Sequence, residues 1–162
     1  MKLFLRGAPA LALLAACSDS AVSVQPGQWE TTLQFTAMDV PGAQEAQLVA
    51  ARQVMAQPTV RSACISAEGA ANPASTFLSA DGESGSCQFS ENTFSGGVIR
   101  VRGTCQPPDG TSAQMEMDGT YTATTIESRV TNRMTAAPGG PGPQLMTLTG
   151  TLTGRRTGDC AR

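Results

Sequence analysis

Apolar and polar residues alternate one by one along much of the chain, as expected where successive side chains point to opposite faces of a β-strand. Residues 28–38 show the pattern clearly, with these residues on one side: Trp29, Thr31, Leu33, Phe35 and Ala37. The pattern recurs in residues 126–134 and in residues 146–153, where four threonines occupy the polar side. These segments predict half-buried strands that turn one face to a core and the other to water.

Two dipeptides predict hairpin turns. Gly96-Gly97 lies between two alternating segments, and a two-residue turn there requires positive φ angles, which glycine adopts without steric strain. The cross-strand pairs expected in that hairpin are Phe94 with Ile99 and Glu91 with Arg102. Asp118-Gly119 is the second signal, because Asp-Gly is typical of a type I′ turn.

One segment breaks the alternation. Prolines on both sides bracket residues 43–57, which are rich in helix formers and contain no glycine or proline. A helix here would place Leu48, Ala51 and Met55 on one side, packed on the sheet or capping a barrel end, and the alternative is a partly ordered linker. The whole pattern predicts an all-β, mainly antiparallel protein: an up-and-down meander forming a curved sheet or open barrel, with one short helix in the segment 43–57.

The N-terminus has the pattern of a secretory signal, in which Lys2 and Arg6 precede an apolar run too short to span a membrane. Residues 14–17, Leu-Ala-Ala-Cys, resemble the lipobox of bacterial lipoproteins, whose cysteine is acylated and becomes the first residue of the mature chain. The resemblance implies attachment to a membrane through diacylglycerol and acyl chains such as palmitate on Cys17. The implied division is a signal over residues 1–16, a lipidated tether over residues 17–26 and a single β domain over residues 27–160.

The alternative is a plain secretory signal whose cleavage site contains a cysteine. The polar run Ser18-Asp19-Ser20 suits a tether after a lipidated residue. In the lipoprotein family, an acidic residue directly after the lipidated cysteine favours retention at the inner membrane of enteric bacteria, and here that position holds Ser18. We therefore expect a protein of the bacterial cell envelope that faces the periplasm, at the outer membrane in preference to the inner.

Four cysteines follow Cys17, and an even number in an oxidising compartment predicts two disulfides. They are Cys64, Cys87, Cys105 and Cys160. Four cysteines allow three pairings. We favour Cys64 with Cys87, which brackets a loop rich in Gly, Ala and Ser, and Cys105 with Cys160, which ties the C-terminus to the sheet. The rival is a four-thiolate metal site, but no C-x-x-C spacing is present, so no metal is expected.

Charge and composition exclude several functions. The chain has 11 basic side chains, of which Lys2 and Arg6 fall in the signal, so 9 remain against 13 acidic ones. The resulting negative net charge does not attract the phosphates of nucleic acids, and no nucleic-acid partner is expected. The chain has no histidine and no lysine after Lys2, which excludes Ser-His-Asp and Cys-His catalysis, a Ser-Lys dyad and Schiff-base chemistry. We expect neither catalytic residues nor a cofactor.

Several short motifs occur in an order that resembles a known family. Gly27-Gln28-Trp29-Glu30 is followed by a proline-bounded segment, then by Cys64-Ile65-Ser66-Ala67-Glu68, two more cysteines and a terminal Gly158-Asp159-Cys160. Over residues 26–160 this arrangement resembles the small bacterial envelope proteins grouped as domain of unknown function 3617. The resemblance implies no activity and no catalytic residues.

The remaining polar candidates have simpler structural explanations. Glu116 and Asp118 form the closest alternating carboxylate pair, but they lack the spacing of a calcium loop. Arg155-Arg156 could contact lipid phosphates, yet neighbouring residues of a strand point to opposite faces. Trp29, the only tryptophan, is on the apolar side of its strand and is expected to be a core anchor.

Three functions remain. The leading one is a non-enzymatic structural or interaction module of an anchored lipoprotein, whose protein or lipid partner the sequence does not identify. The second is a carrier of a small apolar ligand or lipid in a concave β cavity. The expected lining of that cavity is Trp29, Leu33, Phe35, Met115, Met117 and Leu148. The third, a hydrolase that uses carboxylates, has no motif to support it.

Overall fold

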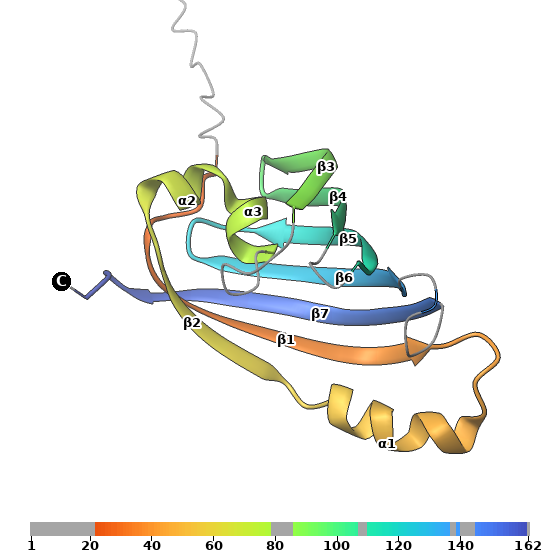
Figure 1. The fold of residues 1–162 in the computed structure, drawn as a ribbon. Helices are drawn as coiled ribbons and strands as arrows, with labels where there is room; N and C mark the ends of the chain where they lie inside the picture. Colours follow the sequence, from red (N-terminus) through yellow and green to blue (C-terminus); the bar gives the residue numbers. More distant parts are fainter. Residues whose placement is uncertain (1–21, 79–85, 107–109, 137–138, 140–144, 162) are drawn as a thin grey trace, which may run out of the picture.

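Seven strands in the described part of the chain form one open, antiparallel sheet (Figure 1). The computed structural model describes residues 22–78, 86–106, 110–136, 139 and 145–161. Its elements are β1 (Gly27–Asp39), α1 (Glu45–Met55), β2 (Thr59–Ile65), α2 (Ala67–Ala71), α3 (Pro73–Leu78), β3 (Ser86–Ser95), β4 (Val98–Gln106), β5 (Ser112–Tyr121), β6 (Thr125–Thr135) and β7 (Leu145–Gly158). The strand order is β2-β1-β7-β6-β5-β4-β3, so β3 to β7 form an up-and-down meander. The predicted fold class is confirmed.

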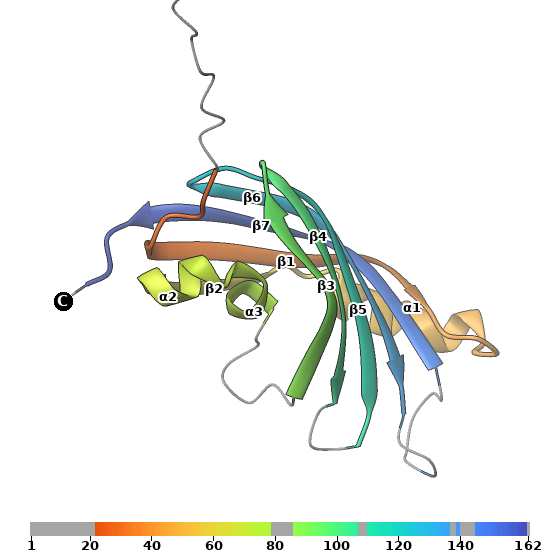
Figure 2. The ribbon, with the colours of Figure 1, turned by 90° about the horizontal axis from the view of Figure 1, so that it is seen from above.

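The sheet curves around the two short helices that connect its edges. β2 lies at one edge and β3 at the other, so the chain between them carries α2 and α3 across one face of the sheet, here called the inner face (Figures 1 and 2). The core between helices and sheet consists of Val24, Trp29, Ile65, Ala70, Ala74, Ile99, Val101, Met117, Tyr121, Ile126, Val130 and Leu152. This crossover places the core at the half of the inner face that the helices cover.

The helix α1 protects the part of β1 that has no neighbouring strand on one side. β2 pairs with β1 only as far as Leu33, which lies opposite Thr59. At the next residue, the Gln34 amide donates a hydrogen bond to the Ala56 carbonyl at 3.2 Å, just beyond the end of α1. The predicted helix is confirmed, and its place beside β1 shields an edge that would otherwise be open to another chain.

The alternation predicted for β1 fails near its end. A bulge at Thr36 shifts the register between Phe35 and Ala37. After the bulge Ala37 is exposed, whereas Met38 is only 7% exposed and lies opposite Leu148 on the inner face. The extra residue of a bulge reverses the sides on which the following residues lie, so the expected inward position of Ala37 was wrong.

One of the two predicted hairpin turns is confirmed and the other is wrong. Gly96 and Gly97 have φ angles of 58° and 79°, and the predicted pairs across this β3–β4 hairpin are both present. Asp118 and Gly119 lie inside β5, opposite residues of β4 and β6. The β5–β6 turn occurs at residues 122–124, where the Thr122 hydroxyl accepts hydrogen bonds from the backbone N–H groups of Thr124 and Thr125, at 3.2 and 3.0 Å.

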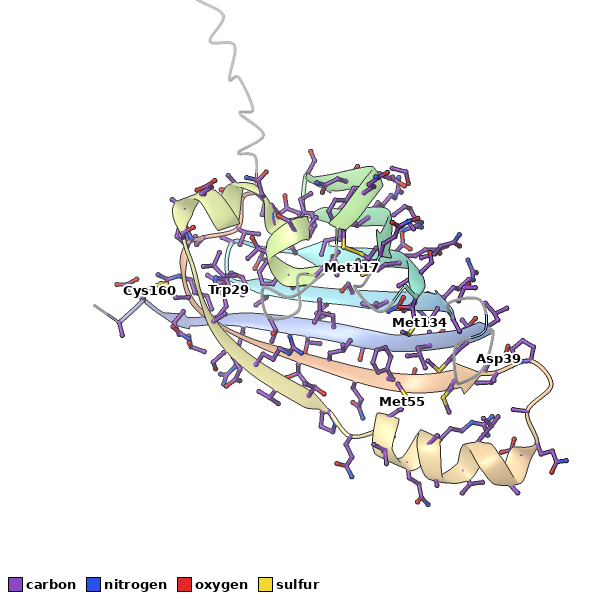
Figure 3. The ribbon with its side chains drawn as sticks, viewed as in Figure 1. Trp29, Asp39, Met55, Met117, Met134 and Cys160 are labelled. Carbon is purple, nitrogen blue, oxygen red and sulfur yellow. A yellow bond between two sulfur atoms is a disulfide. The ribbon has the colours of Figure 1, made fainter. Side chains whose placement is uncertain are left out.

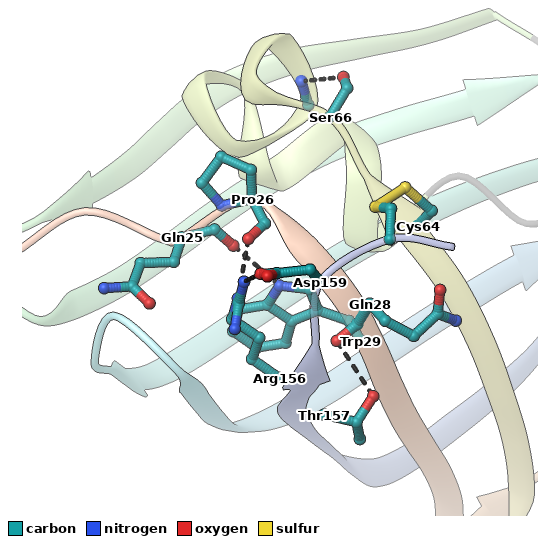
Figure 4. Close-up of a disulfide and its surroundings, with 11 residues drawn as sticks. Gln25, Pro26, Gln28, Trp29, Cys64, Ser66, Arg156, Thr157 and Asp159 are labelled. Carbon is teal, nitrogen blue, oxygen red and sulfur yellow. Dashed lines mark hydrogen bonds and ion pairs between the residues drawn. A yellow bond between two sulfur atoms is a disulfide. The ribbon is translucent and has the colours of Figure 1, made fainter. Parts of the chain in front are cut away.

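The two predicted disulfides exist, but the favoured pairing was wrong. Cys87 and Cys105 lie opposite each other in the β3–β4 hairpin and are bonded. Cys64 of β2 is bonded to Cys160, which follows β7 (Figure 4). The reason is the strand order: Gln28 of β1 lies opposite Cys64 on one side and Gly158 on the other, which brings the two cysteines to the same end of the sheet.

Candidate functional site

The half of the inner face that α2 and α3 leave uncovered is the candidate site. Cross-strand register assembles its residues into two neighbouring rows. The first row runs Phe89, Gly103, Met115, Asn132, Leu148 and Met38; the second runs Cys87, Cys105, Ala113, Met134 and Met146. We call Met38, Met115, Met134 and Met146 the methionine cluster.

The two halves of the inner face differ in chemistry. Branched aliphatic and aromatic side chains dominate the covered half, where Trp29 and Phe77 pack edge to face with ring centroids 5.3 Å apart. In the uncovered half, Met134 and Met146 are directly opposite each other and half-buried, and Met115 is diagonal to Met134. Figure 3 shows Met134 toward the end of β1 at Asp39, and Met117 nearer to Trp29.

Asn132 is the polar residue within the first row. Its side-chain oxygen is buried and has no hydrogen-bond partner among the described residues. It lies between Met115 and Leu148, so the unpaired acceptor is surrounded by apolar side chains of the sheet. Buried acceptors are normally paired, because an unpaired one loses its hydrogen bond to water without replacement. The alternation of β6 places Asn132 on the inner face, and sequence reasoning missed it.

The six residues expected to line a cavity all lie on the inner face, but they are distributed over both halves. Trp29 and Met117 are 1% and 0% exposed and belong to the covered core, against which Leu33 also packs. Met115 and Leu148 lie in the first row of the uncovered half. Phe35 borders a separate hollow of about 110 Å³ between β1 and α1, which is also lined by Thr36, Ala37, Met38, Arg52, Met55 and Ala56.

The N-terminal residues 22–26 are attached to the other end of the sheet. The Tyr121 hydroxyl donates to the Val22 carbonyl at 2.7 Å, and the Gln25 N–H donates to the Ala123 carbonyl at 2.9 Å. The Trp29 indole N–H donates to the Gln25 carbonyl at 2.9 Å (Figure 4). Val24 is 5% exposed and part of the core, so the described fold begins before residue 27.

The carboxylates considered as a possible acid/base or calcium pair are partners of arginines on the outer face. Asp118 and Glu116 approach the Arg102 guanidinium at 2.9 and 3.9 Å, and Glu116 also pairs with Arg133 at 3.1 Å. The hydrogen bond to Asp118 raises the pKa of the Arg102 guanidinium above its ordinary value, and the nearby Glu116 and Glu91 act in the same direction. These carboxylates therefore balance a permanent cation.

Arg155 and Arg156 do not form one basic patch. Arg155 pairs with Glu30 at 2.9 Å on the outer face, with 68% of its side chain exposed. Arg156 is only 22% exposed; it donates to the Pro26 carbonyl at 2.8 Å and pairs with Asp159 (Figure 4). The two side chains thus lie apart, and Arg156 fastens the N-terminal segment to the end of β7.

Two findings concern the described part of the chain as a whole. It contains no group of three His, Cys, Asp or Glu residues placed to hold a metal ion. It also contains no helix with the length and apolar character needed to cross a membrane. The expected lipidation residue, Cys17, lies outside the described residues, as do the expected signal over residues 1–16 and the first part of the tether.

Comparison with known proteins places the fold in a family. The family model of the protein of unknown function DUF3617 matches residues 24–160. The chain belongs to the DUF3617 family. The match begins at Val24, the first buried residue of the described chain, and ends at Cys160, so it spans both disulfides of this DUF3617 protein. No curated protein and no solved structure matches the chain.

Proposed function

We propose that this protein is a membrane-anchored lipoprotein that faces the periplasm, at the outer membrane in preference to the inner, and acts there as a non-enzymatic structural or interaction module. The observation that carries the proposal is the pairing of all four cysteines after Cys17 in two disulfides. Disulfides persist in oxidising compartments, and the pairing leaves Cys17 to the lipobox. The absence of histidine throughout the chain, and of lysine after Lys2, supports a role without catalysis.

The anchor would hold the domain against the bilayer. Val22 is already fixed on the fold through Tyr121, so five residue steps separate it from Cys17. An extended chain advances at most about 3.3–3.6 Å per residue, which limits the separation to roughly 17 Å. The end of the sheet with the β3–β4 and β5–β6 turns would therefore face the membrane, and the methionine cluster at the opposite end would face the periplasm.

The replacement of Cys17 by serine tests the anchor. We expect Cys17→Ser to move the protein from the detergent-phase membrane fraction to soluble or unprocessed material, because serine lacks the thiol that is acylated. The mass of the wild-type mature protein should correspond to a chain starting at Cys17 plus its acyl groups. Ser20→Ala is the matched control and should fractionate as the wild type does. Unchanged fractionation and mass in Cys17→Ser would contradict the proposal.

A second candidate function is a carrier of a small apolar ligand or lipid. It is favoured by the unpaired Asn132 oxygen, which a ligand with one hydrogen-bond donor and an apolar body would satisfy. The test is mass spectrometry of lipid extracted from the protein purified out of its own membrane. Stoichiometric lipid that is lost in Asn132→Leu would favour the carrier, whereas lipid-free protein would favour the structural or interaction module.

A further inference from the structure

We infer that the methionine cluster is a binding site for a soft monovalent metal ion, Cu(I) or its analogue Ag(I), with Met115, Met134 and Met146 as thioether ligands. This inference goes beyond the proposed function and does not depend on the lipid anchor. It rests on two observations. The register of β5, β6 and β7 makes three methionines neighbours, and the chain offers no histidine to compete for the ion.

The register makes the three residues neighbours on the inner face. Met134 of β6 lies directly opposite Met146 of β7, and directly opposite residues of an antiparallel pair have Cβ atoms about 4.5–5.5 Å apart. Met115 of β5 lies opposite Asn132, two residues before Met134, so it is the diagonal neighbour of Met134. Diagonal neighbours remain within reach of long side chains, and methionine is long, unbranched and flexible.

Burial leaves the site accessible yet sheltered. Met134 and Met146 are half-buried and so keep part of their surface in contact with solvent, while Met115 is 9% exposed and lies deeper. Met38 is the diagonal neighbour of Met146 and extends the cluster toward β1. At inner-face positions of β4, β6 and β7 the covered core uses Ile, Val and Leu, with Met117 of β5 as a methionine there, whereas four methionines lie where α2 and α3 do not reach.

The chemistry of the cluster selects the metal class. Thioethers are soft, neutral ligands that prefer Cu(I) and bind hard ions such as Mg²⁺ or Ca²⁺ poorly. The chain has no histidine, and all four cysteines after Cys17 are bonded in pairs, so imidazole and those thiolates do not compete for the ion. A lipid in the same place would need only apolar contact, which Leu or Val supplies equally well.

Titration with Ag(I) in chloride-free buffer tests the inference on the full mature protein in detergent. Ag(I) has the same preference for sulfur as Cu(I) and needs no reductant, so the disulfides stay intact. We expect one equivalent to bind, with affinity at least about tenfold weaker in Met134→Leu and in Met146→Leu, since loss of even supporting groups weakens metal sites by that factor. Leucine keeps nearly the same volume and removes the sulfur.

Met117→Leu is the matched control, because Met117 lies on the same strand as Met115 but in the covered core at 0% exposure. It should bind Ag(I) as the wild type does, and equal loss in this variant would overturn the inference. Absence of binding in the wild type, or binding undiminished in the Met134→Leu/Met146→Leu double variant, would also overturn it.

A second measurement needs no variant. Bound Ag(I) should protect the sulfur atoms of Met134 and Met146 from oxidation by dilute peroxide, measured peptide by peptide by mass spectrometry. Met55 of α1 is not a proposed ligand, so Ag(I) should not change the rate at which its sulfur is oxidised. Equal rates with and without Ag(I) at Met134 and Met146 would overturn the inference even if a variant failed to fold.

Discussion

Replacement of Trp29 by alanine should remove a large part of the stability of the domain. Trp29 is 1% exposed, packs edge to face on Phe77 and donates its indole N–H to the Gln25 carbonyl. Truncation of a buried aromatic residue to alanine costs about 3–5 kcal/mol, because the favourable free energy of burying the removed ring atoms is lost and a cavity remains. A domain of this size has a free energy of unfolding of about 5–15 kcal/mol, so the loss is large.

The magnitude sets the assay. With an m-value of about 2 kcal/mol/M, the urea midpoint should fall by roughly 2 M, and the melting temperature by roughly 10–20 °C. Unfolding is followed by far-UV circular dichroism, since the variant lacks the only tryptophan. Trp29→Phe keeps an aromatic ring against Phe77 and loses the indole hydrogen bond, so it should cost about 1–2 kcal/mol.

Fluorescence of the wild type gives an independent reading. A buried indole emits at short wavelength, and fatty acids or phospholipids should not change that emission because Trp29 lies in the covered core. A Trp29→Ala variant that loses less than about 1 kcal/mol would refute the reasoning. So would a marked change in wild-type emission on addition of lipid, which would place Trp29 in a ligand cavity.

Two further predictions concern links between strands. Replacing Cys64 and Cys160 together by serine should lower the free energy of unfolding by about 4–5 kcal/mol, and replacing Cys87 and Cys105 together should lower it by about 3 kcal/mol. The difference arises because the first disulfide closes a loop of 96 residues and the second a loop of 18. Urea unfolding measures both values, and equal losses of stability would contradict the loop-length argument. Gly119→Ala should lower the free energy of unfolding by more than about 2 kcal/mol, because the new Cβ would lie 2.1 Å from a backbone oxygen of β6. Thermal melting measures the loss, and a variant as stable as the wild type would show that β5 does not pack this closely on β6.

The strands were predictable because they depend on local alternation, which every half-buried strand shows. The inward positions of Ile126, Val130 and Leu152 follow from a period of two, and all three are in the core. The Gly96-Gly97 hairpin was also predictable, since a short turn between two such segments fixes their register. Asp118-Gly119 misled because the same dipeptide fits a strand where a neighbouring backbone comes too close for a side chain.

The disulfide pairing and the candidate site depend on the order of strands, which local sequence does not reveal. Cys64 is bonded to Cys160 because β1 lies between β2 and β7, so that the disulfide links these two strands, which are far apart in sequence. The crossover helices α2 and α3 were missed, although Ser66 caps α2 by accepting a hydrogen bond from the Gly69 N–H at 3.1 Å and Pro73 begins α3. Without that crossover, the boundary between the covered core and the methionine cluster could not be placed.

The clasp formed by Cys64 and Cys160 has a mechanical consequence. It joins β2 to the end of β7, the two strands that flank β1, at the end of the sheet where β1 begins near Gln28. Tension on the N-terminus first loads the contacts that residues 22–26 make with Tyr121, Ala123 and Arg156. It then reaches β1, which is hydrogen-bonded to both of its neighbours. The load passes from β1 into both flanking strands, so a pull on this end of the chain is shared by three strands at once.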